Sequence, residues 1–541
     1  MQPHNTYNTM SSHQSTEISG FIFHPWSWWC NSIDPKHQFA GALITVSALV
    51  LVIACHAWAK INSRRPALPP GPRGLPLVGY LPFLKPDIHR SFTELAQTYG
   101  PIMNVQLGSK ICVVISSPGL AKEVLKDHDV TFANRDTTAA ALAFSHGGSD
   151  IAFNSYGPEW RMLRKVAAQE MMSSSVLDSY YELRRQEVRQ TVRDLYAKMG
   201  TPINISNTNF QTTLNVVTSM LWGGSLDVDD RRAVGAEFEQ VIQQVVELLS
   251  IPNVSDLFPV VAWLDLQGVV RRMKRLSKWL DRIFDSVIDQ RTRLNGVEEK
   301  GKSKDFLQLL LKLKDAEDPK TPLTLDHVKA VLVDLVAGST DTTSTTVEWA
   351  MTKLIENPEI MRKVQEELDE VVGMNDTVEE SHLPRLHYMR AVIKETLRLY
   401  PPIPFLVPRT PSQPCIVGGY MVPMGARVMV NAWAIHRDPE VWDNPLEFRP
   451  ERFLSTSSKF DFNGNDFRYI PFGSGRRVCV GIPMAERMLM FVLAEMLHSF
   501  DWQLPEGTKL DLTEKFGIVL KKAIPLVVIP TARLWNPNLY T

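Results

Sequence analysis

The order of apolar and polar residues predicts a chain built mainly from helices. From about Ser91 onward apolar residues recur at helical spacing, and short runs such as ICVVIS (111–116) and ARVMVNAW (426–433) are typical of strands. The charged segments 295–304 and 314–320 are typical of exposed loops, and no internal repeat interrupts the pattern. We therefore expect one large, mainly α domain with a minor β portion.

The longest predicted helix covers Leu325–Glu356. It contains no proline, offers Thr324 or Asp326 as an N-cap, and stops before an Asn-Pro pair. Its 32 residues would extend about 48 Å. The centre, GSTDTTSTT (338–346), has poor helix propensity, and its hydroxyls can compete for backbone carbonyls and bend the helix. Such a bend could place donors against a ligand, although a polar seam between helices is the simpler explanation of this segment alone.

An apolar run near the N-terminus predicts a membrane anchor. Residues 39–59 contain no Asp, Glu, Lys or Arg, and about 20 helical residues span the hydrocarbon core. Lys60, Arg64 and Arg65 follow, which places the C-terminal side in the cytosol. A cleaved secretory signal is the alternative, but the 38 residues ahead of the run are too many for one.

The anchor divides the chain into four predicted parts. Residues 64–82 are rich in proline, which fixes φ and removes backbone donors, so this stretch predicts a stiff, extended spacer. The expected organisation is a lumenal segment (1–38), the anchor (39–59), a Pro-rich hinge (60–82) and a catalytic domain (83–541).

Charge and cysteine content exclude several classes of function. The 58 basic and 59 acidic residues nearly cancel, which gives no support for a nucleic-acid partner. The five cysteines are scattered, and none forms a CxxC pair or a Cys/His zinc spacing. Neither a disulfide framework nor a structural zinc site is therefore expected.

One predicted ion pair lies on the apolar side of a helix. Glu395 and Arg398 are three residues apart in RAVIKETLRLYPP, and the helical neighbours of Glu395 are apolar. An unpaired buried charge costs several kcal/mol, so the two side chains must remain together. Arg452, in FRPERF, is the candidate third member of this structural cluster.

The main chemical signal is Cys479 in YIPFGSGRRVCVGIPMAERM (469–488). Gly473, Gly475 and Gly481 permit close backbone approach, and the following residues predict a helix. A helix N-terminus and the arginines at 476 and 477 favour a thiolate, so we expect a lowered thiol pKa.

Three interpretations of this cysteine follow. A catalytic nucleophile would need a histidine base, which the motif does not contain but another part of the fold could supply. An axial thiolate ligand of haem iron fits better, because a single thiolate held by amides tunes haem for O–O cleavage. A buried apolar cysteine would leave both arginines unexplained.

At this point the sequence resembles the cytochrome P-450 family of haem-thiolate monooxygenases. FxxGxRxCxG matches Phe472, Gly475, Arg477, Cys479 and Gly481, and ExxR matches Glu395 and Arg398. Further similarities are WxxxR at Trp160 and Arg164, the PPGPRGLP hinge, and an oxygen-activating segment at 338–343. The residues of the anchor, the hinge and the FGSGRR stretch are most similar to those of plant microsomal members, particularly terpenoid (including sesquiterpenoid) and flavonoid hydroxylases.

The resemblance implies a role for each matching residue. Cys479 would ligate the iron of haem b, and Asp341 with Thr342 would supply protons in oxygen activation. Ser339 stands where the family usually has glycine, which puts the shape of the substrate groove in doubt. The implied haem contacts are Trp160, Arg164, Arg409, His436, Phe472, Arg477 and Gly481; the implied core cluster is Glu395, Arg398 and Arg452; the implied substrate pocket is Phe144, Gly338, Ser339, Phe405, Leu406, Val407, Phe516 and Ile518.

The resemblance also implies partners and a place in the cell. We expect a single-pass protein of the endoplasmic reticulum membrane that hydroxylates a small lipophilic molecule with O2 and NADPH-derived electrons from a flavoprotein reductase. Arg161, Lys165 and Arg476 are candidate reductase contacts. Residues 253–270 are expected either to touch the membrane surface or to form a core helix pair. The competing functions are a haem-thiolate dehydratase or isomerase, which needs no O2 or reductase, and a non-catalytic haem-binding protein.

Overall fold

The computed structural model describes residues 46–54, 67–223, 228–294, 305–316, 322–454 and 460–541. The chain forms two units, residues 1–66 and 67–541. In the first unit, residues 46–54 form a helix whose apolar side chains are exposed. Among the described residues no helix is both long and apolar enough to cross a membrane. Most of the predicted 39–59 span lies outside the described residues, so the anchor stays a prediction.

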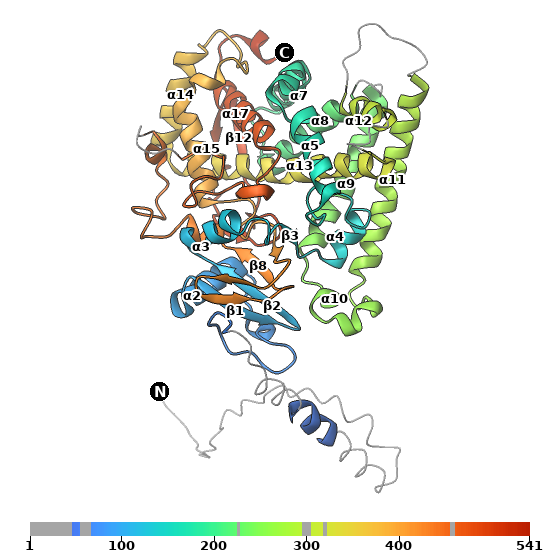
Figure 1. Cartoon of the computed structure of the whole chain (residues 1–541). Coiled ribbons are helices and arrows are strands. Elements are labelled where there is room, and N and C mark those ends of the chain that lie inside the picture. Colours follow the sequence, from blue (N-terminus) through green and yellow to red (C-terminus); the bar gives the residue numbers. More distant parts are fainter. Residues whose placement is uncertain (1–45, 55–66, 224–227, 295–304, 317–321, 455–459) are drawn as a thin grey trace, which may run out of the picture. The chain divides into compact units, whose positions relative to one another are not determined.

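The second unit is mainly helical, as the apolar pattern predicts (Figure 1). Its small sheets are built from short strands. The α-helices are α2 (Ile88–Tyr99), α3 (Pro118–Lys122), α4 (Ala139–Phe144), α5 (Pro158–Val166), α6 (Ser174–Ser179), α7 (Tyr181–Ala197), α8 (Ile205–Trp222), α9 (Val228–Ser250), α10 (Val254–Leu257), α11 (Val269–Leu294), α12 (Phe306–Asp315), α13 (Leu325–Glu356), α14 (Pro358–Val371), α15 (His387–Leu399), α16 (Ala432–Ile435) and α17 (Ile482–Ser499). The strands are β1 (Ile102–Leu107), β2 (Lys110–Ile115), β3 (Asn134–Arg135), β4 (Ile203–Asn204), β5 (Arg409–Thr410), β6 (Cys415–Val417), β7 (Tyr420–Val422), β8 (Arg427–Val430), β9 (Phe500–Gln503), β10 (Glu514–Lys515), β11 (Lys521–Lys522) and β12 (Val527–Ala532).

The two strand-like runs of the sequence meet in the largest sheet, whose strand order is β1-β2-β8-β5-β3. β2 and β8 are parallel, with Cys112 opposite Arg427 and Ile115 opposite Val430. The predicted spacer is partly fixed to this sheet, because the Asn104 N–H donates to the Pro70 carbonyl and Gly79 forms a bridge with Leu107. The described part of the hinge therefore belongs to the folded domain.

Helix α13 has the predicted bounds and runs through the middle of the helical part (Figure 1). Thr324 caps its first turn: the Thr324 hydroxyl accepts the His327 N–H, and His327 Nδ1 accepts the Thr324 N–H. Most of the helix is buried, because α8, α15 and α17 pack around it. Pro358 begins the next helix, so α13 ends where the sequence predicts.

The segment 253–270 is not a core helix pair. It forms α10, a short 3-10 helix η4 (Pro259–Leu264) and the start of α11. Val260 is 88% exposed and Trp263 is 81% exposed, and Leu264 and Leu266 are also exposed. These exposed apolar side chains contradict the prediction that the segment is a core helix pair. They agree with the alternative prediction that it touches the membrane surface.

Candidate active site

Cys479 lies in a tight turn immediately before α17. Its N–H donates to the Phe472 carbonyl at 3.0 Å, and the turn includes the 3-10 helix η7 (Gly475–Arg477). Gly475 has φ +68°, and a Cβ atom at this position would lie 2.0 Å from the Leu125 carbonyl oxygen. Only glycine therefore permits this approach. The turn presents the cysteine side chain to a cavity.

The cavity has a volume of about 340 Å³ and a mostly apolar wall. It lies between the centre of α13, the start of α17, the Cys479 turn and the segment before β5. No histidine is among its lining residues, so a base for a cysteine nucleophile is missing from this wall. The predicted site residues that line it are Arg164, Gly338, Ser339, Thr342, Leu406, Val407, Arg409, Phe472, Arg477, Cys479 and Gly481.

A second cavity of about 220 Å³ adjoins the first, with which it shares Arg135, Ile403, Leu406 and Val407. It contains the predicted substrate residues Phe405, Phe516 and Ile518. Phe144 lines neither cavity and is buried in the helical core, so the structure does not bring it to the site.

Guanidinium groups collect at one side of the larger cavity. Burial lowers the pKa of Arg409 to about 9 and that of Arg477 to about 10, and Arg477 also lowers the pKa of Arg409. Arg409 is 3% exposed, and its Nη1 has no hydrogen-bond partner among the described residues. Arg135 and Arg164 line the same cavity. Asp150 offsets only part of this buried positive charge, so the site favours a further anion, which the carboxylates of a haem would supply.

Trp160 supports the cluster from behind. Its Nε1 donates to the Ile151 carbonyl at 3.0 Å, and the Arg477 guanidinium lies 4.2 Å from the centre of its ring. The Arg477 guanidinium also donates to the Ile151 carbonyl, at 3.1 Å. Trp160 itself does not line the cavity. The structure therefore places Trp160 where it orients Arg477.

The expected lowering of the Cys479 pKa is wrong for the protein alone. Burial raises the pKa of the Cys479 thiol, although the Gly481 and Ile482 N–H groups and Arg164 lower it. The desolvation cost exceeds the contribution of the turn and the helix N-terminus. The Cys479 side chain is nevertheless exposed to the cavity, where a bound metal ion would deprotonate the thiol outright. This favours a metal ligand over a nucleophile.

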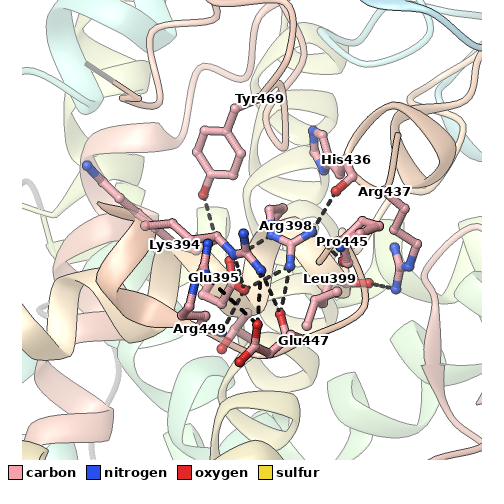
Figure 2. Close-up of polar contacts among 12 residues, drawn as sticks. Lys394, Glu395, Arg398, Leu399, His436, Arg437, Pro445, Glu447, Arg449 and Tyr469 are labelled. Carbon is pink, nitrogen blue, oxygen red and sulfur yellow. Dashed lines mark hydrogen bonds and ion pairs between the residues drawn. The ribbon is translucent and has the colours of Figure 1, made fainter. Parts of the chain in front are cut away.

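Glu395 and Arg398 are the centre of one buried cluster (Figure 2), and Arg452 is its third member. Arg398 binds both Glu395 oxygens, with Nε–Oε2 and Nη2–Oε1 distances of 2.7 and 2.8 Å, and Arg452 Nε lies 3.2 Å from Glu395 Oε1. Arg398 also donates to the carbonyls of His436 and Pro445. Every strong donor of this buried arginine thus has an acceptor, and the cluster joins α15 to the loop before η6 (Pro450–Phe453).

His436 belongs with this cluster and not with the cavity. It is fully buried, its Nε2 accepts the Ile470 N–H at 2.9 Å, and its carbonyl accepts from Arg398. Burial and the neighbouring arginines lower its pKa to about 3, so the ring is neutral. The structure therefore does not support the expected contact between His436 and a haem carboxylate.

Asp341 and Thr342 point to different surroundings. Thr342 lines the cavity, and its hydroxyl donates to the Gly338 carbonyl at 2.7 Å. Asp341 does not line it; the carboxylate is buried and pairs with Lys521 Nζ of β11 at 2.7 Å. The two residues are adjacent in sequence, but the helix places their side chains apart. Asp341 is held by a partner that the sequence did not indicate.

Two acidic residues at the site were missed. Asp334 lines the cavity one helical turn before Gly338, and its Oδ2 accepts the Ile151 N–H at 2.6 Å. Asp150 is buried beside it. A lone acid in the apolar stretch VKAVLVDLV, four residues before Gly338, was the available signal for Asp334.

The cavity has a cysteine on its wall and buried arginines at one side, and it lies against the long central helix of a mainly helical fold. These features together define a haem protein with a thiolate ligand. The chain belongs to the cytochrome P450 family, whose sequence profile matches residues 69–528. The buried arginines, the orphaned Arg409 Nη1 and the cysteine at the cavity wall fit the haem that this family binds.

Relatives and solved structures agree with this assignment. The chain is 41% identical to a flavonoid 3'-monooxygenase of Crocosmia x crocosmiiflora over 487 residues, which covers 88% of this chain and 95% of that protein. It is 38% identical to ferruginol synthase of Salvia fruticosa, covering 92% and 99% of the two chains. A zebra fish cytochrome P450 solved with abiraterone matches with a TM-score of 0.69 and 28% identity, covering 83% of this chain and 99% of that one. The protein is therefore a cytochrome P450 monooxygenase, and it is similar to plant flavonoid hydroxylases.

Proposed function

We propose that this protein hydroxylates a flavonoid, using haem b held by Cys479 and electrons that an NADPH-dependent flavoprotein reductase delivers. The observation that carries the proposal is the position of Cys479, which faces an apolar cavity with buried arginines at one side. When bound, the haem would supply the activation of O2. The haem carboxylates would be held by Arg164, Arg409 and Arg477, with Trp160 behind the last of these.

The substrate class rests on the relatives and on the cavity. Flavonoid 3'-monooxygenases of Crocosmia x crocosmiiflora and Arabidopsis thaliana are 41% and 38% identical to this chain. The apolar lining suits a planar aromatic molecule, and Asp334 and Ser339 add polar groups to the same wall. A terpenoid is the second candidate, supported by the similarity to ferruginol synthase.

Thr342 and Asp341 are the proposed proton-delivery residues. The Thr342 hydroxyl lies at the cavity wall, where it donates to the Gly338 carbonyl and can instead rotate to donate to a ligand in the cavity. Asp341 pairs with Lys521, which is partly exposed. We infer that this ion pair must open before Asp341 exchanges a proton with the cavity side.

We also propose that the protein works on the endoplasmic reticulum membrane. The predicted 39–59 anchor and the exposed Val260 and Trp263 of η4 support contact with lipid. Arg161 and Lys165 are exposed on α5 and are the better candidates for reductase contact. Arg476 is less suited, because it pairs with Asp129 at 2.9 Å.

The test is turnover in microsomes that contain the protein with or without a plant reductase. With NADPH, flavanones and flavones should gain one oxygen atom in products read by mass spectrometry, and omission of reductase or O2 should abolish the product. A rearranged or dehydrated product formed without reductase would support the dehydratase or isomerase alternative. Absence of turnover with flavonoid and terpenoid panels, despite bound haem, would support a non-catalytic role.

A further inference from the structure

Asp334, which is partly accessible at the wall of the larger cavity, forms a carboxyl pair with the buried Asp150 behind it. Asp150, in the loop between α4 and α5, is 1% exposed, and its Oδ2 has no hydrogen-bond partner among the described residues. Asp334 projects from α13 into the cavity lining. Neither carboxyl forms a salt bridge with any described residue. Arg477 and Arg135 lie in the same region but form no direct ion pair with either carboxyl, so the pair is costly unless it shares a proton or meets a ligand.

The pair is held rigidly by the Ile151 peptide. The Ile151 N–H donates to Asp334 Oδ2 at 2.6 Å, and its carbonyl accepts from Trp160 Nε1 and Arg477 Nη1. Asp150 Oδ1 accepts the Phe153 N–H at 3.0 Å. One peptide thus connects the carboxyl pair with the groups proposed to hold the haem. A polar group held this firmly is preorganised for a ligand.

The chemistry of the pair favours a neutral hydroxyl as its ligand. Burial raises the pKa of Asp150 to about 6, although Arg477 and backbone N–H groups lower it, and burial with the charge of Asp150 raises the pKa of Asp334 well above its usual value, so the pair retains a proton near neutral pH. The proton is shared between the two carboxyls, so the Asp334 side chain offers the cavity an acceptor, and a hydroxyl group can donate to it. A cationic ligand would instead be repelled by Arg477 and Arg135, which act on Asp150 from the same region.

We propose that Asp334, supported by Asp150, binds a hydroxyl group of the substrate and is a specificity-determining residue. This rests on the proposed function, in which the cavity holds the substrate beside Cys479. The hydroxyl concerned is one already present on the substrate, distant from the carbon that is oxidised. The pair thereby selects substrates that carry a phenol or alcohol and fixes which edge of the molecule reaches the reaction centre.

The test is ligand binding, measured by the change that a substrate causes in the haem absorption spectrum of the full-length protein. The probes are flavanone and its 5-, 7- and 4'-hydroxy derivatives. In the wild type, at least one hydroxyflavanone should bind about 10-fold more tightly than flavanone, which is the size of one well-placed hydrogen bond. Asp334→Ala should remove this preference and change flavanone affinity by no more than about twofold.

Thr213→Ala is the matched control. Thr213 lines the same cavity from α8, but its hydroxyl already donates to the Asn209 carbonyl. This variant should keep the preference, and both variants should keep the thiolate-type spectrum of the CO complex. A preference that survives Asp334→Ala, or that Thr213→Ala also removes, overturns the assignment.

The wild-type comparison remains decisive if Asp334→Ala does not fold. Equal affinity for flavanone and all three derivatives would overturn the proposal without any variant. If no flavanone binds, the proposed flavonoid function is wrong. The role of Asp334 is then tested by comparing the affinities for a cyclic terpene alcohol and its parent hydrocarbon. Equal affinities for the two would overturn that role.

Discussion

At the scale of single residues, the stability of this protein depends on buried charges that have complete sets of partners. Arg398 is 0% exposed and bonds to Glu395 and to backbone carbonyls of the loop before η6. If Arg398 is removed, water cannot take over its hydrogen bonds to Glu395, because both side chains are fully buried. The cluster therefore fixes the loop that precedes the Cys479 turn.

Removal of Arg398 should be severe. Arg398→Ala leaves Glu395 buried with less compensation, and we expect a loss of about 3–5 kcal/mol in the free energy of unfolding, with little holoprotein recovered. The control is Arg362→Ala on α14, which breaks exposed pairs to Glu359 and Glu366 and should cost under about 1 kcal/mol. Thermal unfolding and haem content measure both. Equal stability of the two variants would contradict the structural role of the cluster.

Glu495 predicts a pH dependence of stability. Burial raises its pKa from 4.5 to about 7, although Arg189 lies 3.2 Å away. The folded state therefore binds this proton more tightly than the unfolded state does. The stability from this group is fully present below pH 4.5 and is lost as pH rises through about 7, a change of about 3 kcal/mol.

Glu495→Gln removes the titrating group. Unfolding measured at several values between pH 5 and 8 should show a smaller fall in stability with rising pH for this variant than for the wild type. Parallel curves for the two proteins would mean that Glu495 does not titrate in this range.

At the scale of elements, α13 carries one threonine that faces the cavity and another, two residues earlier, that does not. Thr342 lines the cavity, whereas Thr340 is buried away from it, although each hydroxyl donates to the carbonyl four residues earlier. The helix thus provides an internal control for the proposed proton delivery.

Thr342→Ala should lower the ratio of product formed to NADPH consumed, because oxygen is then reduced without substrate oxidation. Thr340→Ala removes the same kind of hydrogen bond, from a hydroxyl to a backbone carbonyl, without changing the cavity wall. It should keep the wild-type ratio. Product and NADPH are measured in one assay, so the ratio is independent of enzyme amount. A normal ratio in Thr342→Ala would exclude the threonine from proton delivery.

The Cys479 turn tolerates no side chain at Gly475. Gly475→Ala would combine a left-handed φ with a Cβ atom 2.0 Å from the Leu125 carbonyl oxygen. Gly419→Ala has φ +81° but meets nothing within 4 Å, so it should cost only about 1–2 kcal/mol. We expect Gly475→Ala to lose haem and Gly419→Ala to retain it, as measured by haem per protein. Haem retention in Gly475→Ala would show that the turn can move.

At the scale of the whole molecule, the sequence predicted what short periodic patterns and local spacing encode. The bounds of α13, the strands within 111–116 and 426–433, and the glycine-rich turn before α17 all depend on neighbours in the chain. The Glu395–Arg398 pair is of this kind, and the apolar helix face around it indicated burial.

Side-chain partners from distant segments could not be predicted in this way. Lys521 binds Asp341 from 180 residues away, and the His436 ring accepts the Ile470 N–H while the His436 carbonyl accepts from Arg398. The raised pKa of Cys479 has the same origin, since burial is a property of the whole fold. Local motifs name the residues of this site, and tertiary packing decides which of them face the cavity.

The central claim is that Cys479 is the ligand of a haem iron, and the CO difference spectrum of Cys479→Ser tests it most directly. Cys112, a buried cysteine outside the cavity, provides the control Cys112→Ser. The account predicts a thiolate-type spectrum for the wild type and the control, and its loss in Cys479→Ser. A thiolate-type spectrum in Cys479→Ser would contradict the account.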